Sequence, residues 1–260
     1  MELASQVGAF EKRGIGVAAV IHEPVEALRA FAAKHGISFP LLADPDSTVI
    51  KRFGLVDPEF KSDELTDVPY AGSFLLDAQG VVLEKFFEDA TEYRRTAGSI
   101  LVRFGESGPG ADTRQTDHFT VRSSASNAEL MPGQRFTLAL DFEMQEHHHA
   151  YAPGAEGYRP LALRLDADPL FVFHEPQRPE PRPYFFAPLK ETVPVYEGRF
   201  RMLEDVTVDF RQALSRFGDA PSYTTAVTGR VDYQVCSDRV CYPPGSLPLR
   251  WPVTIRRWVK

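Results

Sequence analysis

The sequence predicts an α/β domain followed by an all-β sandwich. The first observation behind this prediction is a change in hydrophobic periodicity along the 260 residues. Before about residue 104, apolar residues recur at helical spacing; after about residue 118, they alternate with polar residues in short stretches bounded by Pro and Gly. The second is the polar, glycine-rich stretch GESGPGADTRQT, which is typical of a linker. We therefore expect domains at 1–104 and 118–260, joined by a linker at 105–117.

Composition narrows the possible partners. The chain is 43% hydrophobic and 25% charged, as expected for a globular protein long enough to bury two cores. A net charge of -7 and the lack of a basic run argue against nucleic acid as a partner. No apolar stretch approaches the ~20 residues that span a bilayer, so we expect no membrane span in this chain. Nor does a charged-then-apolar signal segment open the sequence.

The first domain begins with alternating helices and strands. Leu3, Val7 and Phe10 have the spacing of one helix face, which predicts a helix over residues 2–12. The continuous apolar run Ile15–Ile21 is typical of a buried parallel strand. A second helix should follow, with Pro24 in its first turn and Gly36 at its end.

The rest of this domain should contain a short helix, a hairpin and a final helix. Asp46 can cap the short helix, which ends at Gly54. The segment SFLLDAQGVVLEKFF reads as two strands joined by a tight turn at Gly80. Thr91 should cap the final helix, which runs to Arg103.

This order of elements covers most of a thioredoxin-like fold. The stretches GVAAVIHEPVEALRAFAAKHGISFPLLADPDSTVIKRFGL and FLLDAQGVVLEKFFED resemble the alkyl hydroperoxide reductase and thiol-specific antioxidant family of peroxiredoxin-like redoxins. In that family, the central strand and the catalytic Cys loop precede the helix that begins here at Glu2. This chain has no cysteine before Cys236, and Ala71 stands where thioredoxins place a cis-proline. The resemblance therefore implies a thioredoxin-like domain that is truncated at its N-terminus and lacks its catalyst.

The second domain contains short alternating segments separated by Pro and Gly turns. These segments predict an antiparallel β-sandwich: FTLALDF, LALRLDA, RFRMLEDVTVDF, TGRVDYQV and LRWPVTI. The stretch Pro176–Pro188 carries too many prolines for a central strand, and we expect it to be an exposed loop with aromatic residues. The segment DFRQALSRFG predicts one short helical turn.

Both cysteines of the chain lie in the stretch VDYQVCSDRVCYPP. The residues before Cys236 alternate as in a half-buried strand, the following Ser-Asp favours a turn, and two prolines after Cys241 end any ladder. We expect a hairpin or tight loop that brings the two thiols within bridging distance. Closing a loop of about six residues stabilises a protein by only about 2 kcal/mol. Spacing alone leaves three possibilities open: a structural disulfide, two reduced thiols or a redox pair.

The same stretch, followed by LPLRWPV, resembles the cysteine strand of the DsbD amino-terminal (alpha) family of immunoglobulin-like thiol:disulfide interchange domains. The likeness runs from about residue 118 to 259 and includes three further segments in the same order: MPGQRFTLALDFEM, HHAYAPGAEGYRPLALRL and PVYEGRF. The resemblance implies that Cys241 engages the thiol of a partner and that Cys236 resolves the mixed disulfide. It implies a thioredoxin-like or membrane redox protein as partner, a periplasmic or cell-envelope location, and no cofactor.

Several residues are candidates for a shell around the two cysteines. His149 and Tyr151 match the family's loop beside the disulfide, and Tyr242 follows Cys241 directly. Asp238 lies between the thiols, where a carboxylate raises a thiol pKa, although the neighbouring arginine has the opposite effect. An aromatic residue shields the disulfide in the resembling family, and the candidates here are Tyr151, Tyr158 and Phe185. Trp251 is more simply explained by core packing.

Metal binding is disfavoured for the run His147–His149. Consecutive residues of a strand point to opposite faces, so three adjacent histidines cannot all bind one ion. No cysteine or carboxylate stands at zinc-site spacing from them.

The sequence therefore predicts thiol–disulfide exchange through Cys236 and Cys241 with a thioredoxin-like partner. Two alternatives stay open at this point. One is a binding module with a structural disulfide and a degenerate redoxin domain. The other is a thiol peroxidase whose catalytic cysteine segment lies outside this sequence.

Overall fold

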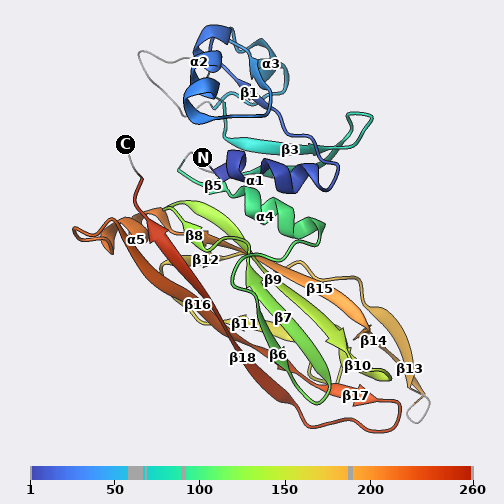
Figure 1. The fold of residues 1–260 in the computed structure, drawn as a ribbon. Helices are drawn as coiled ribbons and strands as arrows, with labels where there is room; N and C mark the ends of the chain where they lie inside the picture. Colours follow the sequence, from blue (N-terminus) through green and yellow to red (C-terminus); the bar gives the residue numbers. More distant parts are fainter. Residues whose placement is uncertain (1, 58–66, 68, 89–91, 187–189, 259–260) are drawn as a thin grey trace. The chain divides into compact units, whose positions relative to one another are not determined.

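The computed structural model describes residues 2–57, 67, 69–88, 92–186 and 190–258. The chain divides into two compact units, residues 1–101 and 102–260. Both are drawn in Figure 1.

The first unit contains four helices and five strands among its described residues: α1 (Glu2–Glu11), β1 (Ala19–Ile21), α2 (Val25–His35), β2 (Leu41–Ala43), α3 (Thr48–Arg52), β3 (Gly72–Leu76), β4 (Val82–Phe87), β5 (Arg94–Arg95) and α4 (Ala97–Leu101). Within it, β1 pairs with β2 in parallel, and β3 and β4 form an antiparallel hairpin. The unit is therefore α/β, with its strands divided between small sheets.

Two details of the first unit correct the sequence prediction. The strand expected over Ile15–Ile21 forms only at its last three residues, because β2 offers three pairing partners. The short helix α3 is held by Asp44 rather than Asp46: the Asp44 carboxylate accepts hydrogen bonds from the backbone N–H groups of Val49 and Ile50, at 3.1 and 2.9 Å. Asp44 is buried, so these two hydrogen bonds satisfy backbone N–H groups of the first helical turn that water cannot reach.

The final helix of the first unit is also shorter than predicted. The N–H of Ser99 donates to Thr96 Oγ1 at 3.1 Å, so Thr96 caps α4. The predicted cap, Thr91, lies outside the described residues. The chain continues from α4 into a 3₁₀ turn, η1 (Val102–Phe104), rather than ending as one long helix.

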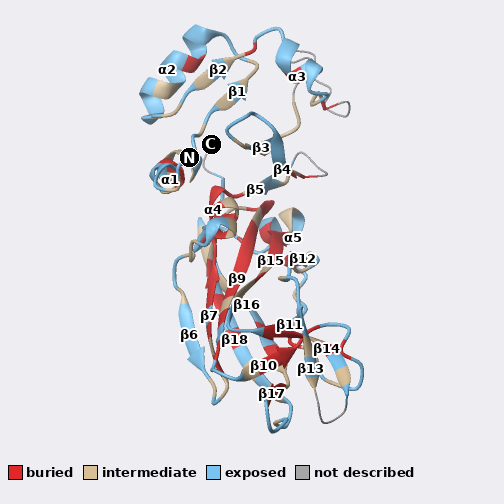
Figure 2. Cartoon of the chain, turned by 90° about the vertical axis from the view of Figure 1, so that its right-hand side faces the viewer, coloured by how far each residue is buried: buried red, intermediate tan, exposed pale blue. Residues whose placement is uncertain are grey.

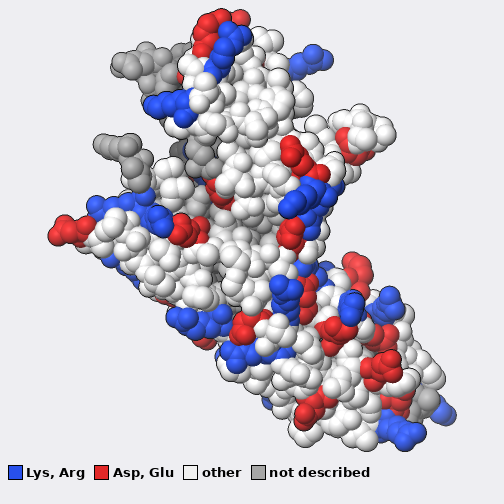
Figure 3. Space-filling model, viewed as in Figure 1, with Lys and Arg blue, Asp and Glu red and all other residues white. Residues whose placement is uncertain are grey.

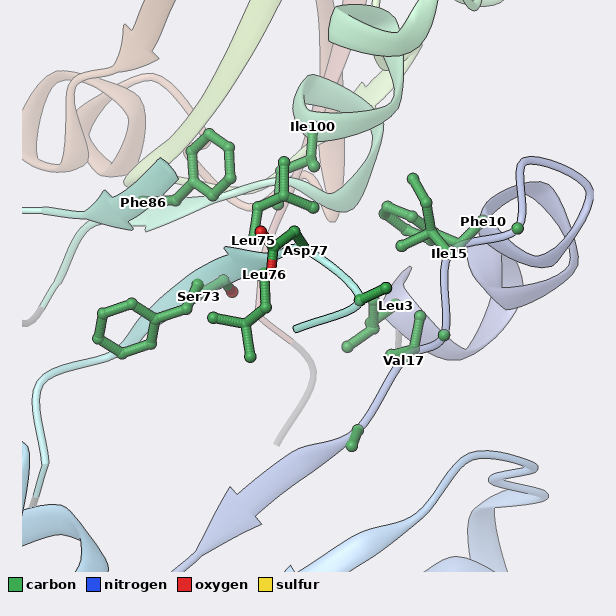
Figure 4. A pocket seen from close by; sticks show the side chains of 15 residues that line it. Leu3, Phe10, Ile15, Val17, Ser73, Leu75, Leu76, Asp77, Phe86 and Ile100 are labelled. Carbon is green, nitrogen blue, oxygen red and sulfur yellow. The ribbon is translucent and has the colours of Figure 1, made fainter. Parts of the chain in front are cut away.

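The first unit has a small core. Phe10, Ala97 and Leu101 are buried together, with Ile15 and Ile100 packed against them. Figure 2 shows little buried surface on its strands, and Val20 and Leu42 are about half exposed, at 46% and 50%. A cavity of about 520 Å³ lies beside this core (Figure 4). It is lined by the segment that leads into β1, by β3 and by apolar side chains of α1 and α4.

The second unit consists almost entirely of strands: β6 (Asp112–Gln115), β7 (Phe119–Ala125), β8 (Glu129–Leu130), β9 (Gln134–Met144), β10 (His148–Tyr151), β11 (Ala162–Leu165), β12 (Phe171–Phe173), β13 (Arg182–Phe186), β14 (Glu191–Glu197), β15 (Arg199–Val208), β16 (Ser222–Tyr233), β17 (Val235–Ser237) and β18 (Gly245–Arg256). One helix, α5 (Phe210–Ser215), follows β15 at the predicted helical turn. The sandwich predicted from alternating segments is confirmed.

These strands form three sheets. Their orders are β12-β15-β9-β7-β6, β11-β16-β18-β8 and β13-β14-β10-β17. The inward residues of the first two build a continuous core that includes Phe136, Leu138, Trp251 and Ile255 (Figure 2). Trp251 is 2% exposed and belongs to this core, as expected. The third sheet extends the sandwich at one end and carries both cysteines.

Part of the predicted linker is not a linker. Residues 112–115 form β6, which pairs antiparallel with β7. All four are exposed, and a polar strand at a sheet edge resists pairing with other chains. Gly108 packs so closely on β7 that a Cβ there would lie 1.7 Å from the carbonyl oxygen of Ala125. Glycine at position 108 therefore allows the chain to pack closely against the backbone of β7.

The proline-rich stretch is also more ordered than predicted. Its residues Arg182–Phe186 form β13, the outer strand of the third sheet. Pro183 is compatible with this position because an edge strand leaves N–H groups unpaired on its outer side. The expectation that this stretch is no central strand is met, but the expectation of a loop is wrong for these residues.

Candidate redox site

Cys236 and Cys241 form a disulfide bond. Cys236 lies in the middle of β17, and the chain turns back so that Cys241 stands opposite it. The turn is closed by backbone hydrogen bonds from Ser237 N–H to Val240 O and from Tyr242 N–H to Val235 O, at 2.8 and 2.9 Å. The alternating residues before Cys236 and the Ser-Asp turn thus produce the tight hairpin that the sequence predicts.

The two cysteines differ in exposure. Cys236 is 1% exposed and packs in a small cluster with Tyr151, Val193 and Val195. Cys241 is exposed to solvent. An attacking thiol can therefore reach Cys241 more easily than Cys236.

The sheet around β17 has two chemically different faces. His149 of β10 stands opposite Cys236, and directly opposed residues of antiparallel strands share a face. Tyr151, two residues further along β10, lies on that same face. Ala150 and Val235 point to the other face and join the main core. The alternation of β10 therefore places the histidine and the tyrosine beside the disulfide.

Tyr151 contacts both sulfur atoms. Its hydroxyl oxygen lies 3.1 Å from Cys236 Sγ and 3.4 Å from Cys241 Sγ. Because disulfide sulfurs carry no proton, the hydroxyl is the donor. Tyr151 is 2% exposed, and burial is the main cause that raises its pKa, so the hydroxyl keeps its proton at neutral pH.

Tyr158 and Glu191 continue the contacts of Tyr151 toward the surface. The rings of Tyr151 and Tyr158 stack with centroids 4.0 Å apart and planes at 19°. The Tyr158 hydroxyl donates a hydrogen bond to Glu191 Oε1, and this bond is the main cause that raises the pKa of Tyr158. The half-buried Glu191 is the first residue of β14.

His149 is buried on the other side of Tyr151. It is 2% exposed, and its ring lies 4.2 Å from that of Tyr184. Burial lowers the pKa of His149, and the nearby Asp238 carboxylate opposes that shift. The imidazole is therefore neutral at pH 7 and contributes shape rather than charge.

The remaining predicted residues lie around the hairpin. Asp238 is exposed and accepts a hydrogen bond from the Tyr184 hydroxyl at 3.2 Å. Tyr242 packs against the main core, with its ring 4.2 Å from that of His118. Phe185 is 62% exposed on β13. Of the three candidate shields, Tyr151 belongs to the cluster around Cys236 and Tyr158 packs against it, whereas Phe185 is exposed and lies outside that cluster.

Sequence reasoning missed Tyr184 and Glu191. Tyr184 lies within the proline-rich stretch for which the sequence predicts a loop, and its position on β13 brings it onto the face of His149. Glu191 follows residues 187–189, which are outside the described part. A Tyr within an edge strand could have been noticed, but no signal in the sequence marks Glu191.

The three adjacent histidines point to different partners. His147 Nδ1 lies 3.4 Å from Asp238 Oδ2, His148 Nδ1 lies 2.9 Å from Glu146 O, and His149 packs on Tyr184. Within the described residues, no group of three or more His, Cys, Asp and Glu side chains is arranged to hold a metal ion.

Figure 3 shows positive and negative side chains interspersed over the second unit on the face in view. No helix of the described residues is long and apolar enough to cross a membrane.

Comparison with known families gives two matches. Residues 1–85 match the AhpC/TSA family. Residues 116–247 match the family described as thiol:disulfide interchange protein DsbD, N-terminal. Both resemblances found in the sequence are thereby confirmed.

Among solved structures, the chain is similar to the N-terminal periplasmic domain of ScsB from Proteus mirabilis, at 18% identity and a TM-score of 0.34, over 54% of this chain and 49% of that one. It is also similar to the reduced N-terminal domain of Neisseria meningitidis DsbD, at 14% identity and a TM-score of 0.28, over 44% of this chain and 74% of that one. The chain thus spans about half of the ScsB domain. No curated protein matches it.

Proposed function

Because the chain belongs to the family of the DsbD N-terminal thiol:disulfide interchange domain, through residues 116–247, we propose that Cys236 and Cys241 exchange a disulfide with a thioredoxin-like partner. The observation that carries this proposal is the unequal exposure of the pair. A partner thiolate needs one accessible sulfur to attack, and Cys241 is exposed whereas Cys236 is 1% exposed. A disulfide that only stabilises the fold does not require an accessible sulfur.

Reduction of the pair proceeds in two steps. A partner thiolate attacks Cys241 Sγ, the bond between the two sulfurs breaks, and Cys236 leaves as a thiolate, which gives a mixed disulfide through Cys241. The partner's second thiolate then attacks the partner's first sulfur, which is bonded to Cys241 in the mixed disulfide. This attack releases Cys241 as a thiolate. Two electrons move from the partner dithiol to the pair, and the two thiolates each take up a proton. The same steps in reverse reduce a partner disulfide.

Tyr151 supplies the polar group for this chemistry. Negative charge develops on Cys236 when the bond breaks, and the Tyr151 hydroxyl, 3.1 Å away, already points at that sulfur. A hydrogen bond to the charged form favours it, so Tyr151 makes Cys236 a better leaving group. The neutral hydroxyl of Tyr151 has this effect without a charged side chain beside Cys236.

For the first part of the chain, we propose a thioredoxin-like redoxin domain over residues 1–104, followed by the sandwich domain over residues 118–260. The AhpC/TSA match supports this assignment. This domain contains no cysteine, so we assign the redox chemistry of the chain to the second one.

The test is a trapping experiment with thioredoxin as the probe. The variant Cys236→Ser, with Cys241 first converted to its mixed disulfide with nitrothiobenzoate, should form a stable mixed disulfide with a thioredoxin that lacks its second active-site cysteine, because the nitrothiobenzoate leaves and no resolving thiol is then present. The matched variant Cys241→Ser should trap little, because the remaining sulfur is buried. For the parent, we expect a reduction potential above about −300 mV, the upper bound typical of structural disulfides. A bridge that resists thioredoxin and dithiothreitol would instead favour a binding module with a structural disulfide.

A further inference from the structure

A polar pocket lies at one end of the sheet that carries the disulfide. It has a volume of about 350 Å³ and is lined by the start of β10, the end of β14 and the hairpin residue Asp238. Two further carboxylates line it, those of Glu146 and Glu197. Its lining residues all belong to the described part of the chain, and none of them is a lysine or an arginine. The pocket is therefore suited to a positively charged group.

The pocket belongs to the same face of the sheet as Cys236. Glu197 of β14 stands opposite His149 of β10, which in turn stands opposite Cys236 of β17. Directly opposed residues of antiparallel strands share a face, so these side chains form one row across three strands. The α-carbons of Cys236 and Cys241 are 4.0 Å apart. Because neighbouring strands are about 4.8 Å apart, the α-carbon of His149 lies about 10 Å from that of Cys241.

His149 offers this pocket a buried hydrogen-bond acceptor. Its side chain lines the pocket and is 2% exposed, and within the described part of the chain neither ring nitrogen has a hydrogen-bond partner. Burial lowers the pKa of His149, and one nitrogen of a neutral imidazole accepts a hydrogen bond. A buried polar atom without a partner is unfavourable, so a ligand that donates an N–H to His149 satisfies an unmet requirement of the fold.

The charges around the pocket leave it negative. The side chains of Glu146 and Glu197 are exposed and form no ion pair with any described residue. Asp238 Oδ2 lies 3.4 Å from His147 Nδ1, and Asp238 Oδ1 accepts a hydrogen bond from Tyr184. No three His, Asp or Glu side chains of the described residues converge as a metal site requires. The ligand chemistry that fits is therefore an organic cation with N–H donors.

We propose that this pocket receives a lysine side chain that the redox partner carries near its attacking cysteine. This inference rests on the exchange function proposed above and adds the kind of partner that the site selects. The ammonium group donates an N–H to His149, and the carboxylates of Glu146 and Glu197 attract its charge. Complementary charge of this kind raises the rate at which the partner thiolate meets Cys241 Sγ.

The test measures attack on Cys241 by short peptides that differ in charge. The full-length variant Cys236→Ser carries nitrothiobenzoate on Cys241 as a mixed disulfide. A peptide thiolate that bonds to Cys241 Sγ breaks this disulfide and releases the coloured nitrothiobenzoate thiolate, which stopped-flow absorbance records. The peptides are Cys-Gly-Gly-Lys, Cys-Gly-Gly-Gln and Cys-Gly-Gly-Glu, each with blocked ends.

Two features of this design isolate the pocket. An extended chain rises about 3.3–3.6 Å per residue, so the lysine of the first peptide lies about 10 Å from its cysteine, as the distance from Cys241 to the pocket requires. Each rate is divided by the rate of the same peptide with free dithiobis(nitrobenzoate). This division removes differences in thiol reactivity and in attraction to the leaving group.

We expect the lysine peptide to react about three- to tenfold faster than the glutamine peptide at low ionic strength, and the glutamate peptide to be the slowest. This advantage should vanish in about 1 M salt, where the Debye length is about 3 Å. Added to the Cys236→Ser chain, Glu146→Gln and Glu197→Gln should each at least halve the lysine advantage. Glu129→Gln is the matched control, because it removes an exposed carboxylate of β8 outside the pocket, and it should leave the advantage unchanged.

The outcomes separate this inference from the proposed function. If no peptide releases nitrothiobenzoate, Cys241 is inaccessible, and the exchange function itself is contradicted. Equal normalised rates for the three peptides contradict the pocket alone. A lysine advantage that Glu129→Gln lowers as much as the pocket variants do reflects the net charge of -7 and also overturns the pocket. So does a lysine advantage that neither Glu146→Gln nor Glu197→Gln reduces.

Discussion

The hydroxyl of Tyr151 lies 3.1 Å from Cys236 Sγ and 3.4 Å from Cys241 Sγ, so Tyr151→Phe removes the one donor that both sulfurs share among the described residues. Hydrogen bonds to a charged group contribute about 1.5–3 kcal/mol, and about 1.4 kcal/mol corresponds to tenfold in rate. We expect thioredoxin to reduce this variant about tenfold more slowly than the parent, as measured by stopped-flow fluorescence of thioredoxin. Tyr196→Phe, on the opposite face of the same sheet, should react like the parent. Equal rates for Tyr151→Phe and the parent would contradict the role of the hydroxyl.

Glu204 gives a pH dependence that is independent of the redox site. It is 7% exposed, and its pKa is raised from 4.5 to about 7, mainly by burial. The positive charge of Arg178 lowers the pKa of Glu204, and the negative charge of Asp205 raises it. The unfolded chain therefore releases this proton at lower pH than the folded chain does. The contribution of protonated Glu204 to the stability of the folded chain is therefore full below about pH 4.5 and is lost as the pH rises through about 7.

Glu204→Gln cannot ionise, so we expect its melting temperature to exceed that of the parent by a few degrees at pH 8 and by less at pH 4. Calorimetry of both proteins at the two pH values measures the difference. Glu197→Gln, an exposed carboxylate, should show no such pH-dependent gain. A gain that is the same at both pH values would show that ionisation of Glu204 is not its cause.

At the residue scale, the sequence predicts the two cysteines and the tyrosine of the HAYAPG segment but not the whole site. His149 and Tyr151 are close to each other in the sequence and share a face through strand alternation, which a pattern can show. Tyr184 and Glu191 reach the site only because β13 and β14 pair beside β10. The order of strands in a sheet is a property of the whole domain, so local pattern does not reveal it.

At the scale of elements, the prediction succeeds where a strand buries only one of its two faces, because apolar and polar residues then alternate along it. The strands of the sandwich alternate because one side meets the core, and the sequence shows that directly. The run Ile15–Ile21 is misjudged because the length of a strand depends on its partner, and β2 pairs with only three residues. The sequence predicts a linker where polar β6 forms, because an exposed edge strand has no apolar face to mark it.

The start of the second unit provides a prediction at this scale. Arg201 of β15 pairs with Asp141 of β9 at 2.5 Å and also donates to the carbonyl oxygens of Val102 and Glu106. It therefore ties the start of the predicted linker to the sheet. Arg199, on the same strand, pairs with Glu143 at 2.6 Å, but its side chain is 80% exposed.

We expect Arg201→Gln to lower the free energy of unfolding by about 1.5–3 kcal/mol, because it breaks several charge-assisted hydrogen bonds at once. Limited proteolysis should cut this variant within residues 105–111 faster than it cuts the parent. Arg199→Gln removes an exposed pair worth about 0–1 kcal/mol and should be cut at the parent's rate. Similar cleavage of all three proteins would show that Arg201 does not hold the segment.

At the scale of the whole molecule, the disulfide contributes little to the stability of the sandwich. The main core is formed by the inner faces of two sheets, and Cys236 belongs to a separate small cluster. Residues 236 and 241 are only 5 apart in sequence, so closing the loop restricts few conformations of the unfolded chain. The bond therefore ties together one hairpin and leaves the packing of the sandwich to its apolar residues.

The double variant Cys236→Ser plus Cys241→Ser should consequently stay folded. A loss of about 2 kcal/mol from a short loop corresponds to a fall in melting temperature of no more than about 4–8 °C for a domain of this size. Calorimetry of the oxidised parent, the reduced parent and the double variant measures that fall, and exchange with thioredoxin should vanish in the double variant alone. If the sandwich unfolds when the bond is opened, the bond is a staple, and its accessible sulfur at Cys241 then has no role in exchange.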